Sequence, residues 1–98
     1  MKYILKLYVT EGSSNSMRAI KNLKKILQAL PDDKYEVEII NLLKNPELSI
    51  IDSIIATPTL VKSYPFPPRK VIGDLSDVEK VIYGLGLKDF LDINKDEE

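Results

Sequence analysis

The side chains that most often carry out chemistry in enzymes are scarce in this sequence. Its 98 residues include no cysteine and no histidine. Thiol nucleophiles, disulfides, imidazole general bases and the usual ligands of zinc are therefore all missing. We expect a protein that is not an enzyme and that has no catalytic residue, no metal site and no cofactor.

The serines and carboxylates that remain have structural interpretations. Ser13, Ser14 and Ser16 lack the histidine base that would activate a serine nucleophile, whereas hydroxyls that precede an apolar helical pattern are typical of helix N-caps. Asp74 and Glu79 would be one pair for acid and base chemistry, but turn formation and helix capping account for both. Neither group indicates catalysis.

Basic side chains offer another kind of chemistry, the binding of an acidic surface. Lys62, Arg69 and Lys70 lie on or beside a predicted hairpin, where they would form a basic patch for an acidic protein. The alternative is ordinary solvated charge along a sheet edge, which discourages aggregation. The formal net charge is -1, without the basic footprint that phosphate neutralisation requires, so we expect no nucleic-acid partner.

The first elements that position these side chains follow from apolar periodicity. Residues 3–9 are nearly all apolar and rich in aromatic and branched side chains, as in a central strand covered on both faces. Tyr35, Val37 and Ile39 alternate with charged residues, which predicts a second, parallel strand. Between these strands, a helix that ends before Pro31 is predicted by the spacing of Met17, Ile20, Leu23, Ile26, Leu27 and Leu30.

A short helix and a hairpin follow in the second half of the chain. Asn45-Pro46 resembles an N-cap with proline at the first helical position, and this helix of a few turns extends to Ile54 or Ile55. Residues 59–64 and 69–72 are predicted strands joined by a proline-rich connection, and they should pair antiparallel.

A last helix begins near a capping box. The run Ser76-Asp77-Val78-Glu79 allows the Ser76 oxygen to accept from the third amide while Glu79 reaches back. Gly84 and Gly86 weaken this helix by about 1 kcal/mol each relative to Ala. The helix therefore either ends there or is easily lost.

The resulting order, βαβαββα, is that of the thioredoxin-like α/β fold, in which helices flank a mixed four-stranded sheet. We expect a single domain over residues 1–93 and a charged, frayed tail over residues 94–98. No apolar run reaches the roughly 20 residues of a membrane helix, and residues 1–4 lack the apolar core of a signal peptide. A cytoplasmic protein without membrane insertion is the expectation.

Thr57-Pro58-Thr59 precedes a strand at the place where thioredoxin-like domains often carry a cis-proline, whose neighbouring backbone pairs with a peptide or thiol substrate. On the sequence alone, a recognition edge and a structural turn at Pro58 are equally good interpretations. A glutathione-binding transferase that uses the Thr57-Pro58 backbone is the enzyme alternative. Residues 12–16 contain no cysteine where redox members have one, which excludes disulfide exchange.

Five segments of the chain are distinctive in combination. They are Tyr3-Ile4-Leu5-Lys6-Leu7-Tyr8-Val9, Asn15-Ser16-Met17-Arg18-Ala19, Leu43-Lys44-Asn45-Pro46, Ala56-Thr57-Pro58-Thr59-Leu60 and Ile72-Gly73-Asp74-Leu75-Ser76. In order and spacing, and without cysteine, they closely resemble the KaiB family of circadian clock proteins. The likeness runs from Tyr3 to Leu87.

This resemblance implies a fold-switching regulatory protein of a circadian clock or timing system. In that family, a ground state with a rearranged C-terminal half assembles into tetramers, and a rarer thioredoxin-like monomer binds the ring-shaped ATPase KaiC. The bound monomer displaces the histidine kinase SasA and recruits KaiA. We therefore expect self-association as a dimer or tetramer, a KaiC-like ATPase as partner, and KaiA and a SasA-like kinase as further partners.

Residue roles are carried over by the same resemblance. Basic positions on the KaiC-binding face of the family are matched by Arg18, Lys62, Arg69 and Lys70. Positions that concern the fold switch or the structure are matched by Tyr3, Pro58, Gly84, Gly86 and Asp89.

The chain also departs from the clock members. At Gly86 and Asp89 they tend to carry Asp and Tyr, so the balance between the two folds is expected to differ. Glu38 and Ser53 replace Lys, and Ile50-Ile51 replaces an acidic pair. Lost positive charge weakens attraction to an acidic partner, and exposed isoleucines favour self-association or another partner. A KaiB-like stress-related or chaperone-like binding module is therefore the alternative function.

Overall fold

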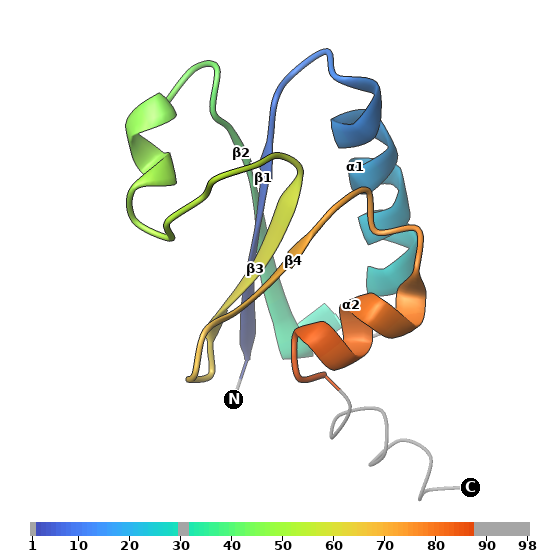
Figure 1. Cartoon of the computed structure of the whole chain (residues 1–98). Coiled ribbons are helices and arrows are strands. Elements are labelled where there is room, and N and C mark those ends of the chain that lie inside the picture. Colours follow the sequence, from blue (N-terminus) through green and yellow to red (C-terminus); the bar gives the residue numbers. More distant parts are fainter. Residues whose placement is uncertain (1, 30–31, 88–98) are drawn as a thin grey trace, which may run out of the picture.

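The computed structural model describes residues 2–29 and 32–87. The predictions made for Asp89 and for the tail at residues 94–98 lie outside these residues. In the described part, a four-stranded mixed sheet has the strand order β2-β1-β3-β4. Two α-helices cover one face of this sheet (Figure 1). The mixed four-stranded sheet predicted from the sequence is confirmed.

The central strand is β1 (Tyr3–Val9), which pairs in parallel with β2 (Tyr35–Asn41) as predicted. Because side chains alternate along a strand, Leu5 and Leu7 enter the core beneath the helices, while Tyr8 is buried on the opposite face. The second half of β1 is thereby covered on both sides, which explains its almost continuous apolar sequence.

Helix α1 (Ser14–Leu27) is capped by Ser13, whose hydroxyl accepts a hydrogen bond from the backbone N–H of Ser16 at 3.3 Å. Its buried side chains are those of Ser16, Ala19, Leu23 and Leu27. The prediction that Met17 belongs to the apolar face is wrong, since its side chain is 59% exposed. One residue advances a helix by about 100°, which turns Met17 away from the face that carries Ser16.

The predicted hairpin is confirmed, and both of its strands have the predicted bounds. Strand β3 (Thr59–Tyr64) pairs antiparallel with both β1 and β4 (Arg69–Ile72). The connection between β3 and β4 contains cis peptide bonds before Pro65 and Pro67.

Helix α2 (Val78–Gly84) lies on the same face of the sheet as α1 (Figure 1). The prediction that Ser76 caps this helix is wrong, because the Asp77 carboxylate accepts from the Lys80 N–H at 3.1 Å. The backbone N–H of Ser76 instead donates to the Asp74 carboxylate at 3.0 Å in the preceding turn. The helix consequently begins one residue later than a capping box on Ser76 requires.

The segment predicted as a helix of a few turns from Asn45 is shorter. Only a 3-10 helix, η2 (Pro46–Ser49), forms, and the Asn45 side chain makes no capping hydrogen bond. Ser53 then has a φ of 53°, in the left-handed region that ends a helix. The branched isoleucines nearby further disfavour a regular helix. This segment lies on the face of the sheet opposite to α1 and α2 (Figure 1), where Leu48 packs against a small second core.

Candidate functional site

Lys62 is a predicted partner-binding residue that the fold removes from the surface. Its register with Leu5 and Arg69 places it on the helix-covered face of the sheet, where only 4% of the residue is exposed. Its Nζ donates to the carbonyl of Pro65 at 2.9 Å. Burial, and secondarily the charge of Arg69, lowers the pKa of the Lys62 ammonium. The prediction that Lys62 contributes to an exposed basic patch is therefore wrong for this arrangement.

Arg69 and Lys70 are both exposed, but they point to opposite faces of β4 because they are consecutive in the strand. Arg69 lies beside Lys62 on the helix-covered face. Lys70 lies on the other face, where its Nζ donates to the carbonyl of Ser53 at 3.2 Å. The hairpin thus presents one cation on each side of the sheet instead of a single basic patch.

Arg18 lies on α1, close to the turn that follows β4. Its Nε is 3.4 Å from the Asp74 carboxylate, and its guanidinium also donates to the side-chain oxygen of Asn15. Hydrogen bonds from Ser76, and after them Arg18, hold the pKa of the Asp74 carboxyl below its ordinary value. Since Arg69 begins β4 and Asp74 follows its end, Arg18 and Arg69 occupy opposite ends of that strand.

The backbone around Pro58 is used within the fold. The Thr57-Pro58 peptide bond is cis, and the buried Pro58 offers its carbonyl to the N–H of Gly73 at 2.9 Å. The hydroxyls of Thr57 and Thr10 are 2.6 Å apart. These contacts support the structural interpretation of Pro58 over an open recognition edge.

The hydroxyls of Ser13 and Ser16 also form hydrogen bonds within the fold. Ser16 is only 1% exposed, and its Oγ accepts from the backbone N–H of Thr10 at 3.0 Å. With Ser13 capping α1, the structural interpretation of these two serines is supported.

The predicted switch residues lie in or beside the helix-side core. Tyr3 packs against that core from the start of β1, in register with Tyr35. Gly84 lies where α2 approaches β4, and a Cβ at this position would be 2.6 Å from a methyl group of Val71. A side chain at position 84 would therefore collide with β4.

Gly86 ends α2 in the left-handed conformation, with a φ of +72°. Its N–H donates to the carbonyl of Tyr83 at 3.2 Å, and the N–H of Leu87 donates to that of Ile82 at 2.9 Å. These are the two hydrogen bonds of a Schellman C-cap, which favours glycine at this position. Of the two sequence-based interpretations, helix termination accounts for Gly86.

A polar cluster that the sequence reasoning missed joins the turn after η2 to the sheet. The hydroxyl of Tyr8, a fully buried residue, donates to the Asp52 carboxylate at 2.5 Å, and Lys6 Nζ lies 3.7 Å from the same oxygen. Burial, followed by the hydrogen bond to Asp52, raises the pKa of the Tyr8 phenol. The available signal was a single carboxylate between the isoleucine pairs 50–51 and 54–55.

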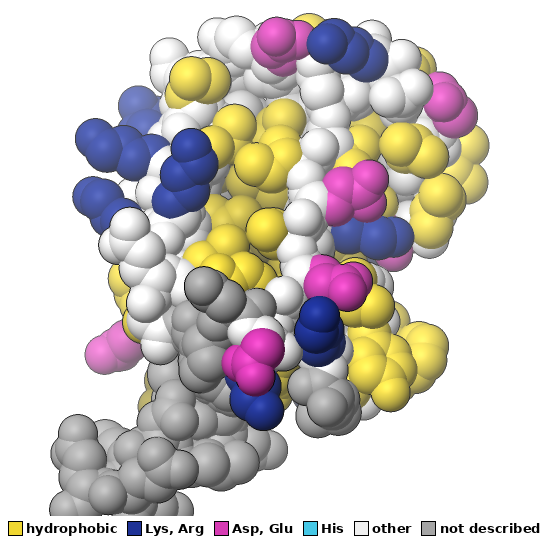
Figure 2. Space-filling model, turned by 180° about the vertical axis from the view of Figure 1, so that it is seen from behind, with side chains coloured by type: hydrophobic (Ala, Val, Ile, Leu, Met, Phe, Trp, Pro, Cys, Tyr) yellow, Lys and Arg dark blue, Asp and Glu magenta, His cyan; other side chains and the backbone are white. Residues whose placement is uncertain are grey.

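Two groups of apolar side chains remain exposed. Ile50, Ile51 and Ile55 beside η2 are 77%, 66% and 89% exposed, so the expected exposure of the first two is confirmed. Val37 and Ile39 on the edge strand β2 are 41% and 46% exposed, although their alternation predicted a covered face. Figure 2, which views the molecule from behind relative to Figure 1, shows uncovered hydrophobic side chains next to a group of Lys and Arg side chains. Both groups are candidate surfaces for another protein.

Residues 2–29 and 32–87 contain no group of three or more carboxylates that could hold a metal ion. In the same residues, no helix has the length and apolar character required to cross a bilayer.

A family model described as KaiB domain matches residues 6–87. The circadian clock oscillator protein KaiB of Trichodesmium erythraeum is 52% identical over 95 residues, which cover 97% of this chain and 90% of that protein. The protein of the same name from Synechococcus elongatus is 54% identical over 85 residues, which cover 87% of this chain and 83% of the relative.

Solved structures give the fold independently. The N-terminal domain of SasA from Synechococcus elongatus superposes with a TM-score of 0.66 at 28% identity, covering 79% of this chain and 74% of that domain. Mitochondrial thioredoxin 3 from Saccharomyces cerevisiae superposes with a TM-score of 0.70 at 20% identity, covering 86% and 79%. The thioredoxin-like fold predicted from the order of the elements is confirmed.

Proposed function

The chain belongs to the KaiB family, and from this we propose that it is a non-catalytic regulatory protein of a circadian clock or timing system. In this proposal it acts in the cytoplasm and binds a KaiC-like ATPase ring. The observation that carries the proposal is the family match over residues 6–87. That span includes all four basic residues assigned to the binding face.

Three of the four assigned basic side chains are accessible to an acidic partner, although they do not form a single patch. Arg69 and Lys70 are exposed at the hairpin, and the Arg18 side chain is 57% exposed on α1. We assign direct contacts to these three residues, and to Lys62 an indirect role as a positive charge beneath Arg69.

A change of fold is part of the proposal. Helix α2 has only seven residues, of which Val81 alone is buried, and Leu85 and Leu87 add two apolar anchors. So small an attachment is compatible with a C-terminal half that rearranges in an oligomeric ground state, as a dimer or tetramer. The thioredoxin-like form would be the form that binds the ring, since a partner shifts an equilibrium toward the state it prefers.

Further partners follow from the likeness to the SasA domain. A SasA-like kinase whose N-terminal domain has the same fold would compete with this chain for the ring. KaiA would be recruited by the bound form.

The test is complex formation with the KaiC homologue from the same source, incubated with ATP for many hours and followed by size-exclusion chromatography. We expect a slowly forming complex that Arg69→Ala weakens. Lys44→Ala, which removes an exposed cation elsewhere, serves as the matched control. No complex after prolonged incubation would count decisively against the proposal.

A second candidate function is favoured by the exposed isoleucines 50, 51 and 55. In a KaiB-like stress-related or chaperone-like module, these side chains would contact unfolded or self-associating protein. Ser53→Lys combined with Glu38→Lys should strengthen binding to the KaiC homologue if the first function holds. Ile50→Glu with Ile51→Glu should abolish suppression of aggregation if the second one holds.

A further inference from the structure

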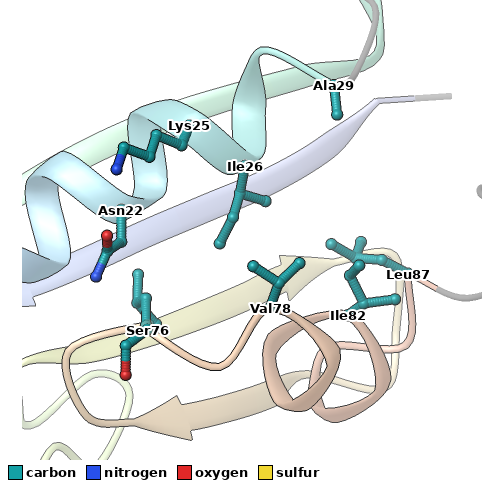
Figure 3. Close-up of a pocket in the computed structure, with 9 residues that line it drawn as sticks. Asn22, Lys25, Ile26, Ala29, Ser76, Val78, Ile82 and Leu87 are labelled. Carbon is teal, nitrogen blue, oxygen red and sulfur yellow. The ribbon is translucent and has the colours of Figure 1, made fainter.

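The fold leaves an aromatic pair uncovered at the connection between β3 and β4. The rings of Tyr64 and Phe66 lie edge to face, with centroids 6.1 Å apart and planes at 73°. These residues are 42% and 77% exposed, and neither belongs to the two hydrophobic cores of the described residues. By contrast, Figure 3 shows apolar side chains of α1 and α2, among them Ile26 and Ile82, directed toward each other. Because aromatic rings contribute strongly to interfaces when they become buried, the pair is a candidate anchor for a partner.

The connection that carries the pair, residues 64–68, is called the aromatic tip below. It lies at the end of the sheet where β1 begins (Figure 1). Proline rings restrict φ at Pro65, Pro67 and Pro68, and the buried Lys62 donates a hydrogen bond to the carbonyl of Pro65 at 2.9 Å. A tip that is held in one shape before binding loses little conformational entropy when a partner receives it.

The charges next to the tip along the chain are all positive. Between Asp52 and Asp74 the sequence contains no Asp or Glu, but it contains Lys62, Arg69 and Lys70. Arg69 and Lys70 directly follow the tip, are both exposed, and point to opposite faces of the sheet because they are consecutive in β4. A concave acidic site that receives the tip can reach both cations, whereas a flat surface against either face of the sheet meets only one. The charges therefore fit a pocket with carboxylates at its rim.

We propose that the aromatic tip inserts into an apolar pocket of a partner protein, where Tyr64 and Phe66 fill the pocket and Arg69 and Lys70 pair with carboxylates at its rim. The inference rests on the proposed function, because the partner is the KaiC-like ATPase ring to which both cations are assigned. It adds the contact that keeps the complex together. Protein interfaces commonly join an aromatic centre to a polar rim, and a few central residues supply most of the binding energy.

The first test compares dissociation rates of complexes that the full chain forms with the KaiC homologue and ATP during long incubation. Phe66→Ala should raise the dissociation rate roughly tenfold or more, as the loss of a central interface residue does. Phe66→Leu, which keeps an apolar side chain, should reverse most of this increase. Leu43→Ala shortens another apolar side chain, which is 64% exposed, and is the matched control that should leave the rate unchanged. Because Phe66 is exposed, the free variants should unfold at nearly the original temperature.

The second test reports whether position 66 becomes buried in the complex. The sequence contains no Trp, so 5-hydroxytryptophan can be incorporated at this position alone in Phe66→Trp. This fluorophore is excited at wavelengths where the tryptophans of the partner do not absorb. In the complex, acrylamide should quench it much less than it quenches the same fluorophore incorporated in Leu43→Trp.

The outcomes separate this inference from the proposed function. If the original protein forms no complex, the proposed function fails and the inference fails with it. If the complex forms, an unchanged dissociation rate in Phe66→Ala or equal quenching of the two fluorophores overturns the inference alone. An effect of Phe66→Ala on the rate of complex formation only would place that effect in the change of fold and would also overturn the contact. Sedimentation with phosphatidylserine vesicles that requires Phe66, together with a quenched fluorophore in the ring complex, would assign the tip to a lipid surface instead.

Discussion

The backbone of Gly84 lies so close to Val71 that a Cβ on residue 84 would come within 2.6 Å of a Val71 methyl group. Val71 is buried in β4 and is 5% exposed. The absence of a side chain at Gly84 therefore sets how closely α2 approaches the sheet, and this contact is one of the few that hold α2 in place.

Gly84→Val should destabilise the described arrangement by about 1–3 kcal/mol, as overpacking of a close contact does. Urea denaturation followed by circular dichroism measures this free energy. In a Val71→Ala background the cost of Gly84→Val should be smaller, because the opposing methyl groups are gone. Simple additivity of the two substitutions would contradict the contact.

Gly86→Ala should cost about 1–2 kcal/mol of stability, because a Cβ disfavours the left-handed conformation. The cost is one of backbone strain alone, since the nearest atoms to a Cβ there, Lys62 Nζ and Arg69 Nε, are 3.9 Å away. Thermal unfolding measures the difference.

Gly86→Asp should lower the stability less than Gly86→Ala does, because the Asp carboxylate would lie close to the cations of Lys62 and Arg69. Gly86→Asn, of nearly the same size without charge, is the matched control. The advantage of Asp over Asn should shrink in about 1 M salt, where screening is strong. Equal stability of these two variants at low salt would mean that the cations do not reach residue 86.

Tyr8→Phe should destabilise the protein by about 1.5–3 kcal/mol, since a hydrogen bond to the charged Asp52 is lost. Because the pKa of folded Tyr8 is raised above the ordinary 10.0, the contribution of the phenol is present below that pH and is lost as the pH rises above it. Stability against urea should therefore fall above pH 10.0 more steeply in the original protein than in Tyr8→Phe. Tyr64→Phe, at a residue that is 42% exposed, is the control and should keep the steep fall.

Asp74 should confer an acid-sensitive contribution to stability. Its carboxyl pKa is lowered by Ser76 and Arg18, so the contribution is present above the ordinary value of 3.8 and is lost as the pH falls below it. Asp74→Asn should remove this pH dependence, whereas Asp33→Asn, at an exposed position, should leave it. Ser76→Ala should raise the pKa of the Asp74 carboxyl, measured by nuclear magnetic resonance titration.

Local sequence determined most of the fold. The bounds of β1, β3 and β4 agree with the prediction, because the apolar runs are bounded by turn residues that no distant contact has to override. The prediction from local sequence was wrong where two neighbouring residues could each cap the same helix. Both Ser76 and Asp77 can cap a helix, and the hydrogen bond from the Ser76 N–H to Asp74 gives that role to Asp77.

By itself, then, the sequence determined the family and the thioredoxin-like order of strands and helices, since both are written in residue types and their spacing. Only the tertiary structure decided which basic side chains reach the solvent. Lys62 is buried because its strand register turns it toward the helices, whereas Lys70 points to the opposite face. Likewise, Val37 and Ile39 alternate as if covered, yet they stay half-exposed because β2 is an edge strand. Burial depends on neighbours far away in the chain, and those neighbours are fixed only when the sheet and helices have packed.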